Sequence, residues 1–257
     1  MAFKYFLLSE DNGKFVLTLN RPDKLNAVTH DMGLELRDIL HRINENHDSR
    51  TLIITGAGKG FCSGADVSGN EQKQSLNAWV GVWDGVIQQM RAFRRPIIGA
   101  INGVAAGMGF SLTTACDIRI ASEQARFTSI FVRRALGVDC GLSYNLPRIV
   151  GLSNAFRLMY TGEIIDAQTA LGMGLVSEVV PAEDLLPTAE ALAGKIAENP
   201  PLTVSAIRKV TYAAQESPLH TMLGMEFHTN RMLMHTEDYT EGIMSFREKR
   251  APSFKGR

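Results

Sequence analysis

Asp139 is the residue whose surroundings most strongly suggest chemistry, because it lies among small and apolar residues in the stretch GVDCGLSY, residues 137–144. An apolar environment raises the pKa of a carboxyl group and lets it exchange protons near neutral pH. An aspartate before Cys-Gly is also common as a turn or helix-cap residue. From this stretch alone, Asp139 could be a general acid/base or a turn residue.

Two glycine-rich turns could approach a negatively charged ligand group. GAGKG, residues 56–60, lacks the Gly-Lys-Ser/Thr ending of a phosphate loop. NGVAAGMGF, residues 102–110, does not match the dinucleotide pattern G-x-G-x-x-G, but we expect a helix to begin there at Met108 or Gly109. The first N–H groups of a helix lack intrahelical acceptors and favour negative charge. Close helix–strand packing explains the same glycines equally well.

A second turn of small residues, FCSGADV at 61–67, could supply another donor. The Ala65 N–H lies within it. Two N–H groups that converge on one oxygen would form an oxyanion hole, which stabilises the charge that develops during acyl chemistry. Whether Ala65 and the start of the helix near Met108 converge depends on the fold.

The elements that must position these residues follow from hydrophobic periodicity and from glycine and proline breaks. The pattern predicts a helix over residues 29–46 and a second amphipathic helix, including Trp79 and Met90, that ends before Pro96. It predicts strands over residues 14–19, 51–55, 97–101, 117–122 and 176–180. Strands thus alternate with helices, and residues 200–257 are helical apart from a basic tail. This order indicates an α/β protein.

The bulk composition excludes several classes of function. The chain has 257 residues, with 27 basic and 27 acidic side chains and a formal net charge of zero. That balance argues against nucleic acid as the main partner. Cys62, Cys116 and Cys140 have the spacing of neither a disulfide framework nor a metal site, so we expect buried, reduced thiols and no bound metal.

The N-terminal stretch MAFKYFLLSEDNGK does not have the pattern of a signal peptide. The longest apolar runs are also too short to span a bilayer. We therefore expect a cytoplasmic protein that does not act in a membrane.

Six blocks of sequence together resemble the crotonase superfamily, also called the enoyl-CoA hydratase/isomerase family. They occur in the order of the family and cover nearly the whole chain. The blocks are NRPDKLNAV (20–28), ITGAGKGFCSGADV (54–67), PIIGAINGVAAGMGFSLTTACDIRIAS (96–122), LPRIVG (146–151), TGEIIDAQTALGMGLVSEVV (161–180) and EGIMSFREKRAPSFKG (241–256).

The resemblance implies a fold and an assembly. It implies a spiral of ββα units over residues 1–199 and a helical trimerisation region over residues 200–257. The family assembly would be a homotrimer or a homohexamer.

The resemblance also implies an acyl-CoA thioester as substrate, with no separate cofactor because coenzyme A is part of that substrate. The Ala65 and Met108 N–H groups would hold the thioester oxygen as it becomes an enolate. Gly107 would let the backbone approach the ligand closely. The position of Met108 usually carries a small residue in the family, so its side chain would narrow the acyl pocket.

The resemblance also implies which segments would bind coenzyme A. The resemblance implies that the nucleotide and pantetheine lie against two segments, represented here by Lys24, Leu25 and Ala27 and by Asp66 and Val67. In the basic tail, Lys249 and Lys255 could bind the 3′-phosphate of coenzyme A, although a solvated tail explains these charges as well.

The residues at the hydratase positions bear on which reaction is catalysed. The two glutamates of the family's hydratases fall on Ser111 and Phe131, and neither can replace a carboxylate as a general base. Asp139 matches the single acid of certain isomerases, among them epoxyphenylacetyl-CoA and Δ3,Δ2-enoyl-CoA isomerases. One carboxylate suffices to move a proton from C2 to C4, and Phe131 would then be an apolar wall.

Three hypotheses follow. The first is an enoyl-CoA isomerase that uses Asp139 as its acid and base. The second is a hydratase in which Asp139 or Glu163 activates water. The third is an acyl-CoA-binding protein without catalytic activity.

Overall fold

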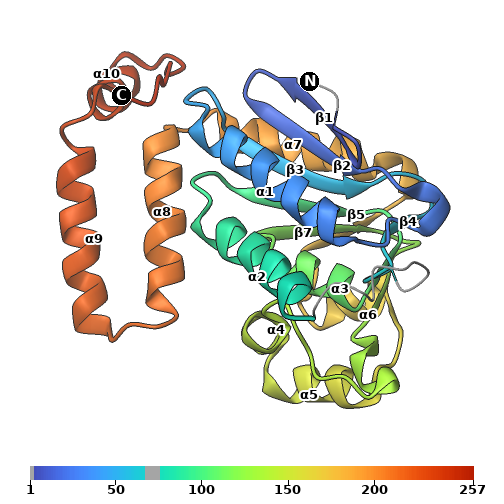
Figure 1. Ribbon diagram of the computed structural model, residues 1–257. Helices are drawn as coiled ribbons and strands as arrows, with labels where there is room; N and C mark the ends of the chain where they lie inside the picture. Colours follow the sequence, from blue (N-terminus) through green and yellow to red (C-terminus); the bar gives the residue numbers. More distant parts are fainter. Residues whose placement is uncertain (1–2, 67–75) are drawn as a thin grey trace.

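The computed structural model describes residues 3–66 and 76–257 (Figure 1). Within these two ranges, the side chains of all residues except 76–80 are described. Val67 lies outside the described residues, and nothing is described of the Trp79 side chain. No helix within the described residues is both long enough and apolar enough to cross a membrane.

The main sheet has six strands in the order β1-β2-β3-β5-β7-β10. β1 pairs antiparallel with β2, and the other neighbours pair parallel. The strands are β1 (Phe6–Asp11), β2 (Lys14–Leu19), β3 (Thr51–Gly56), β5 (Ile97–Ile101), β7 (Ile118–Ser122) and β10 (Glu178–Val180). The expected strands are confirmed, and β1 is an addition. Its hairpin turn at Asn12-Gly13, where both residues have positive φ, is the signal that could have predicted it.

The second sheet has the strand order β4-β6-β8-β9. Its strands are β4 (Gly60–Cys62), β6 (Val104–Ala106), β8 (Arg126–Thr128) and β9 (Ile165–Asp166). β3, β5 and β7 are each followed, within a few residues, by a strand of this second sheet and then by a helix. The chain is therefore a spiral of ββα units, as expected. These strands are too short to carry a periodic hydrophobic pattern, which is why sequence analysis missed them.

The helices cover both faces of the main sheet (Figure 1). They are α1 (His30–Glu45), α2 (Leu76–Ala92), α3 (Met108–Thr114), α4 (Leu142–Val150), α5 (Leu152–Thr161), α6 (Ala167–Gly172) and α7 (Leu185–Ala197). Thr29 caps α1 by accepting a hydrogen bond from the Met32 N–H at 3.2 Å. The buried face of α1 has the predicted spacing, and α7 packs Leu185, Ala189 and Ala193 on the opposite face of the sheet.

The last three helices form an arm beside the spiral: α8 (Pro201–Ala214), α9 (Leu219–Leu233) and α10 (Glu237–Glu248). Arg208 of α8 ties the arm to the core. It is buried, forms an ion pair with Asp117 at 2.8 Å, and donates to the Met90 and Phe93 carbonyls. The helical character expected for residues 200–257 is confirmed.

Candidate active site

The Ala65 and Met108 N–H groups lie on adjacent segments. Ala65 follows β4, and Met108 is the first residue of α3, which follows β6; β4 and β6 pair parallel. Neither N–H has a hydrogen-bond acceptor within the described residues. Both are therefore available to a ligand oxygen, which is the requirement for an oxyanion hole. The helix starts at Met108, as the sequence predicted.

Glycines bring these two segments into contact. A Cβ atom at Gly64 would lie 2.9 Å from the Ala106 carbonyl oxygen and 3.7 Å from the Met108 nitrogen. A Cβ atom at Gly109 would lie only 2.0 Å from the Cys62 carbonyl oxygen. Backbone so close to backbone leaves no room for a side chain. Close packing, one of the two alternatives from the sequence, is therefore present at these glycines, and ligand approach remains a prediction.

Gly107 and Phe131 shape the space at the start of α3. Gly107 has φ of 53°, a conformation that favours glycine. A Cβ there would lie 3.5 Å from Ile130 Cγ2 and 3.9 Å from Phe131 Cζ. Phe131 is buried in the short 3₁₀ helix Ile130–Arg134. Its ring is therefore an apolar wall beside the start of α3.

Asp139 lies in the loop before α4, next to α3. Its Oδ1 atom is buried and has no hydrogen-bond partner in the described structure. Burial is the main cause that raises the pKa of Asp139, and the negative charge of Asp84 raises it further, while a hydrogen bond with Cys140 opposes the shift. A carboxyl group in this state is suited to accept and return a proton near neutral pH.

Ser111 holds the Asp139 loop against α3. Its hydroxyl is fully buried and donates to the Asp139 carbonyl oxygen at 3.1 Å. The Leu142 N–H donates to the same carbonyl at 3.1 Å. Ser111 lies one turn after Met108, so this bond places the backbone of Asp139 within one helical turn of the proposed oxyanion hole. Ser111 therefore helps to position the loop that carries Asp139.

Asp84 of α2 is an acid that sequence analysis did not include in the site. It is half-buried, and its charge acts on Asp139 and on Cys140. One turn further along α2, Ile87 Cγ2 would lie 3.3 Å from a Cβ atom at Gly141. The same helix face therefore runs along the loop that carries Asp139. Helical spacing alone did not show which residues this face would meet.

The predicted coenzyme A segments lie together. Arg21 joins them by donating to the Ala27 carbonyl oxygen at 2.5 Å and forming an ion pair with Asp66 at 2.8 Å. Lys24 and Leu25 are exposed on the neighbouring turn. The arrangement forms a surface beside Ala65 that an extended ligand could follow.

Lys249 and Lys255 are not brought to this site within one chain. Lys249 ends α10, and the arm places α10 and the C-terminus far from β4 and α3 (Figure 1). The tail is folded back on α10, because the backbone N–H groups of Lys255 and Gly256 donate to the buried carboxylate of Asp238 at 2.6 and 2.8 Å. The backbone of the tail is therefore anchored, while the Lys249 and Lys255 side chains are exposed, as the alternative of a solvated tail expects.

Glu163 is engaged elsewhere. Its carboxylate forms an ion pair with Arg157 at 2.6 Å, and its N–H donates to the Thr161 hydroxyl. It stands between α5 and β9 rather than at the start of a helix. Cys62, Cys116 and Cys140 are free and buried, as expected.

Comparison with known proteins defines the family. Residues 9–257 match the family model described as enoyl-CoA hydratase/isomerase. The chain belongs to the enoyl-CoA hydratase/isomerase family, with the crotonase fold that its two sheets and spiral connections display.

Individual relatives carry names from both branches of the family. The chain is 34% identical to the 1,2-epoxyphenylacetyl-CoA isomerase of Escherichia coli, over 98% of this chain and 99% of that one. It is 32% identical to the crotonyl-CoA hydratase of Syntrophomonas wolfei, over 99% of each chain. The crystal structure of an enoyl-CoA hydratase from Bacillus anthracis superimposes with a TM-score of 0.95 at 35% identity, covering 99% of this chain and 100% of that chain.

Proposed function

We propose that this enzyme shifts a double bond within an enoyl-CoA, with Asp139 as the single proton carrier. The observation that carries the proposal is the half-buried Asp139 carboxyl group, whose buried Oδ1 atom has no hydrogen-bond partner among the described residues. By resemblance, Ser111 and Phe131 stand where the family's hydratases carry their two glutamates. Here Ser111 holds the Asp139 loop, and Phe131 forms an apolar wall. A double-bond shift needs no second acid.

The proposed reaction balances around one carboxyl group. The Asp139 carboxylate removes the C2 proton, and the electron pair of that C–H bond moves into the conjugated system to give a dienolate. The Ala65 and Met108 N–H groups stabilise the negative oxygen. The protonated Asp139 then returns the proton to C4. Because the shift is redox-neutral, it needs no cofactor beyond the coenzyme A of the substrate.

Hydration is the second candidate function, because relatives such as the Syntrophomonas wolfei protein are named hydratases. A water molecule would then have to be activated by Asp139, with a second group supplying the proton to carbon. Glu163 is a weak candidate for either role, since Arg157 already holds its carboxylate.

Parallel assays of two substrates separate these candidates. We expect the protein to convert 3-enoyl-CoA and to hydrate 2-enoyl-CoA poorly. Asp139→Asn should lower the isomerisation rate by roughly 10²–10⁴-fold, the usual contribution of a general acid/base. It should leave acyl-CoA binding intact. Glu163→Gln is the matched control and should retain activity.

Other outcomes would point elsewhere. Hydration of 2-enoyl-CoA that exceeds isomerisation and depends on Asp139 would favour the hydratase. Full isomerase activity in the Asp139→Asn protein would remove Asp139 from the mechanism. Tight acyl-CoA binding without any turnover would favour a binding protein.

A further inference from the structure

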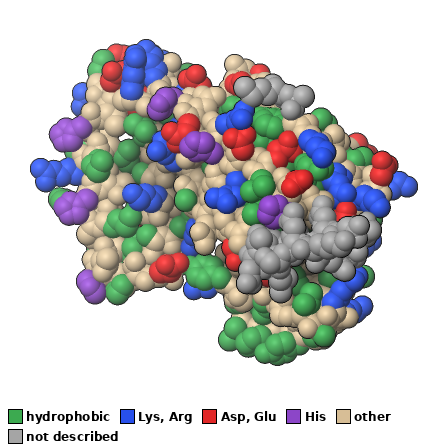
Figure 2. Space-filling view, viewed as in Figure 1, with side chains coloured by type: hydrophobic (Ala, Val, Ile, Leu, Met, Phe, Trp, Pro, Cys, Tyr) green, Lys and Arg blue, Asp and Glu red, His purple; other side chains and the backbone are tan. Residues whose placement is uncertain are grey.

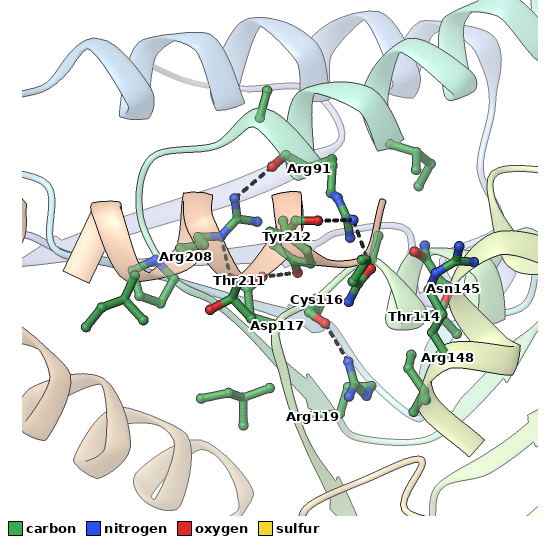
Figure 3. Close-up of a pocket in the computed structure, with 18 of the residues that line it drawn as sticks. Arg91, Thr114, Cys116, Asp117, Arg119, Asn145, Arg148, Arg208, Thr211 and Tyr212 are labelled. Atoms are coloured by element: carbon green, nitrogen blue, oxygen red, sulfur yellow. Dashed lines mark hydrogen bonds and ion pairs between the residues drawn. The ribbon is translucent and has the colours of Figure 1, made fainter. Parts of the chain in front are cut away.

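A cavity of about 1030 Å³ lies between helix α8 and the core (Figure 3). It is bounded by α2, α4 and α8 and by the first residues of β7. It borders the C-terminal end of α3 at Thr114, whereas the Met108 N–H lies at the other end of that helix. Its volume is at the upper end of the range for small-molecule sites.

The wall of this cavity carries more positive than negative charge. Four arginines line it, Arg91, Arg119, Arg148 and Arg208, against two carboxylates, Asp117 and Glu216. Asp117 is already paired with Arg208, and it also accepts a hydrogen bond from Tyr212. The other three arginines form no ion pair with a carboxylate in the described part of the chain.

These three arginines donate only to neutral groups. Arg91 donates to the Gln215 side chain at 2.9 Å and to the Tyr144 hydroxyl at 3.2 Å. Arg148 donates to the Tyr144 carbonyl oxygen at 2.8 Å, and Arg119 to the Leu175 carbonyl oxygen at 2.6 Å. Arg91 is half-buried and Arg148 is exposed, and neither is paired with a carboxylate in the described residues. An anion in the cavity would therefore accept charge-assisted hydrogen bonds from them.

Aromatic rings hold two of the guanidinium groups in place. Arg91 lies 3.7 Å from the centroid of the Tyr212 ring and 5.3 Å from that of Tyr144. Arg148 lies 3.7 Å from the centroid of the Tyr144 ring. Arg91 and Arg148 therefore both pack on Tyr144. Groups that are already ordered lose less entropy when they bind a ligand.

The remaining wall is largely aliphatic, with Ile87, Ile118, Ile149 and Ile207 among its residues. Burial also lowers the pKa of Arg119, while the nearby Cys116, Tyr212 and Asp117 oppose this shift. The combination of an apolar body with two fixed guanidinium groups selects an organic acid over inorganic phosphate.

We propose that this cavity binds an organic acid, whose carboxylate lies between Arg91 and Arg148 and whose aliphatic body packs on the isoleucines. Gly141 lines the cavity only two residues after Asp139. The ligand would therefore lie directly behind the loop that carries Asp139.

The carboxylate could belong to a free acid or to the far end of an acyl-CoA chain. In the second case the acyl group would extend past Asp139 between α2 and α4, and this version rests on the proposed function.

Calorimetric titration of the full-length protein with adipate, a six-carbon dicarboxylate, tests the site without any turnover. We expect one saturable site per chain, and no binding of the uncharged hexane-1,6-diol. Arg91→Gln and Arg148→Gln should each weaken adipate binding at least tenfold. Arg94→Gln is the matched control, because Arg94 is an exposed arginine outside the cavity lining, and it should bind adipate within twofold of the parent protein.

Two results would overturn the proposal: no saturable binding of adipate, or an equal loss in the Arg94→Gln protein. Thr203→Phe gives a second reading that does not depend on the arginines, since Thr203 lines the cavity and a larger side chain would occupy it. It should abolish adipate binding while the thermal transition is retained. Unchanged binding in this variant would also contradict the proposed site.

Kinetics then distinguish the two sources of the carboxylate. If it is the end of the substrate, Arg91→Gln should raise KM at least tenfold for an enoyl-CoA ending in a carboxylate, and leave KM for hexenoyl-CoA unchanged. If the carboxylate belongs to a free acid, Arg91→Gln should change KM for the two substrates by the same factor. Adipate binding should still be lost in this variant. Because adipate binding is measured separately, failure of the isomerase assignment would leave this test intact.

Discussion

At the scale of single residues, the site depends on a carboxyl group kept in an unfavourable environment. Asp139 has one buried oxygen without a partner, and both burial and Asp84 disfavour its ionised form. The same features that destabilise the ionised carboxyl make it a stronger base. Under the proposed mechanism, stability and activity are therefore opposed at this position, as is common in active sites.

The first prediction concerns stability and pH. Because the pKa of Asp139 is raised in the folded protein, the folded state binds more protons than the unfolded state. The resulting penalty is absent below the ordinary aspartate pKa of 3.8 and fully present above the raised value. Asp139→Asn should therefore increase the free energy of unfolding more at pH 7 than at pH 4. Urea denaturation at both pH values measures this, and an equal change at both would contradict it.

The second prediction concerns Asp84. Asp84→Asn removes a negative charge that raises the pKa of Asp139, so the acidic limb of the kcat/KM profile should move to lower pH, by less than about one unit. The plateau rate at high pH should change little, because Asp84 acts through Asp139. Asp38→Asn on the exposed side of α1 is the control. A lower plateau with an unmoved limb would instead indicate a purely structural role for Asp84.

At the scale of elements, the proposed oxyanion hole depends on how closely α3 approaches β4. Helix α3 has only seven residues, and its first turn touches the Cys62–Gly64 backbone through glycines. A short helix placed in this way puts its first N–H group beside the loop after β4. The position of Met108 is therefore set by packing at Gly64 and Gly109.

The third prediction follows from this contact. In Gly109→Ala the new methyl group would meet the Cys62 carbonyl oxygen at 2.0 Å, so α3 must shift. We expect Gly109→Ala to lower the free energy of unfolding by about 1–3 kcal/mol or more, and to reduce turnover. Gly224→Ala, in α9 and with open space around it, should be neutral or stabilise by about 0.5–1 kcal/mol. Denaturation curves and activity of both variants test this, and equal effects would contradict it.

At the scale of the whole molecule, the arm exposes large apolar side chains. Leu219, Leu223 and Phe227 of α9 lie at helical spacing and are 74%, 57% and 64% exposed. Figure 2 shows hydrophobic side chains on the surface of this arm. An apolar stripe of this kind indicates a surface that becomes covered by another molecule. A trimer or hexamer of this chain remains our prediction for what covers it.

The fourth prediction concerns this assembly. Sedimentation equilibrium should give three or six times the chain mass of 28.2 kDa. The double variant Leu223→Glu with Phe227→Glu should shift the distribution toward monomer, because it places charges on the stripe. Thr221→Glu, an exposed residue of α9 away from the stripe, is the control and should leave the mass unchanged. A monomeric parent protein would contradict the prediction.

Assembly also bears on the basic tail. Helix α10 and the C-terminus, which carry Lys249 and Lys255, lie far from β4 and α3 of their own chain (Figure 1). Their expected contact with the 3′-phosphate of coenzyme A would therefore require the tail of another copy. The division at residue 199 remains a prediction, although buried Arg208 joins the arm firmly to the core.

The sequence by itself determined the longer elements and the candidate donors. Strands β2, β3, β5 and β7 and the start of α3 at Met108 follow from local patterns of apolar residues, glycine and proline, which act over a few neighbouring positions. Six ordered blocks were enough to identify the family. They were not enough to decide between isomerase and hydratase, since relatives with both kinds of name resemble this chain along nearly its whole length.

Only the tertiary structure decided which side chains meet. In the folded chain, the charge of Asp84 acts on Asp139, and Ser111 holds the Asp139 loop. Helix α10 and the C-terminus, which carry Lys249 and Lys255, lie away from the site. These contacts join segments separated by many residues, and they depend on how whole helices pack on the spiral. Local sequence patterns carry no information about such packing, because each pattern reflects only its own helix or strand.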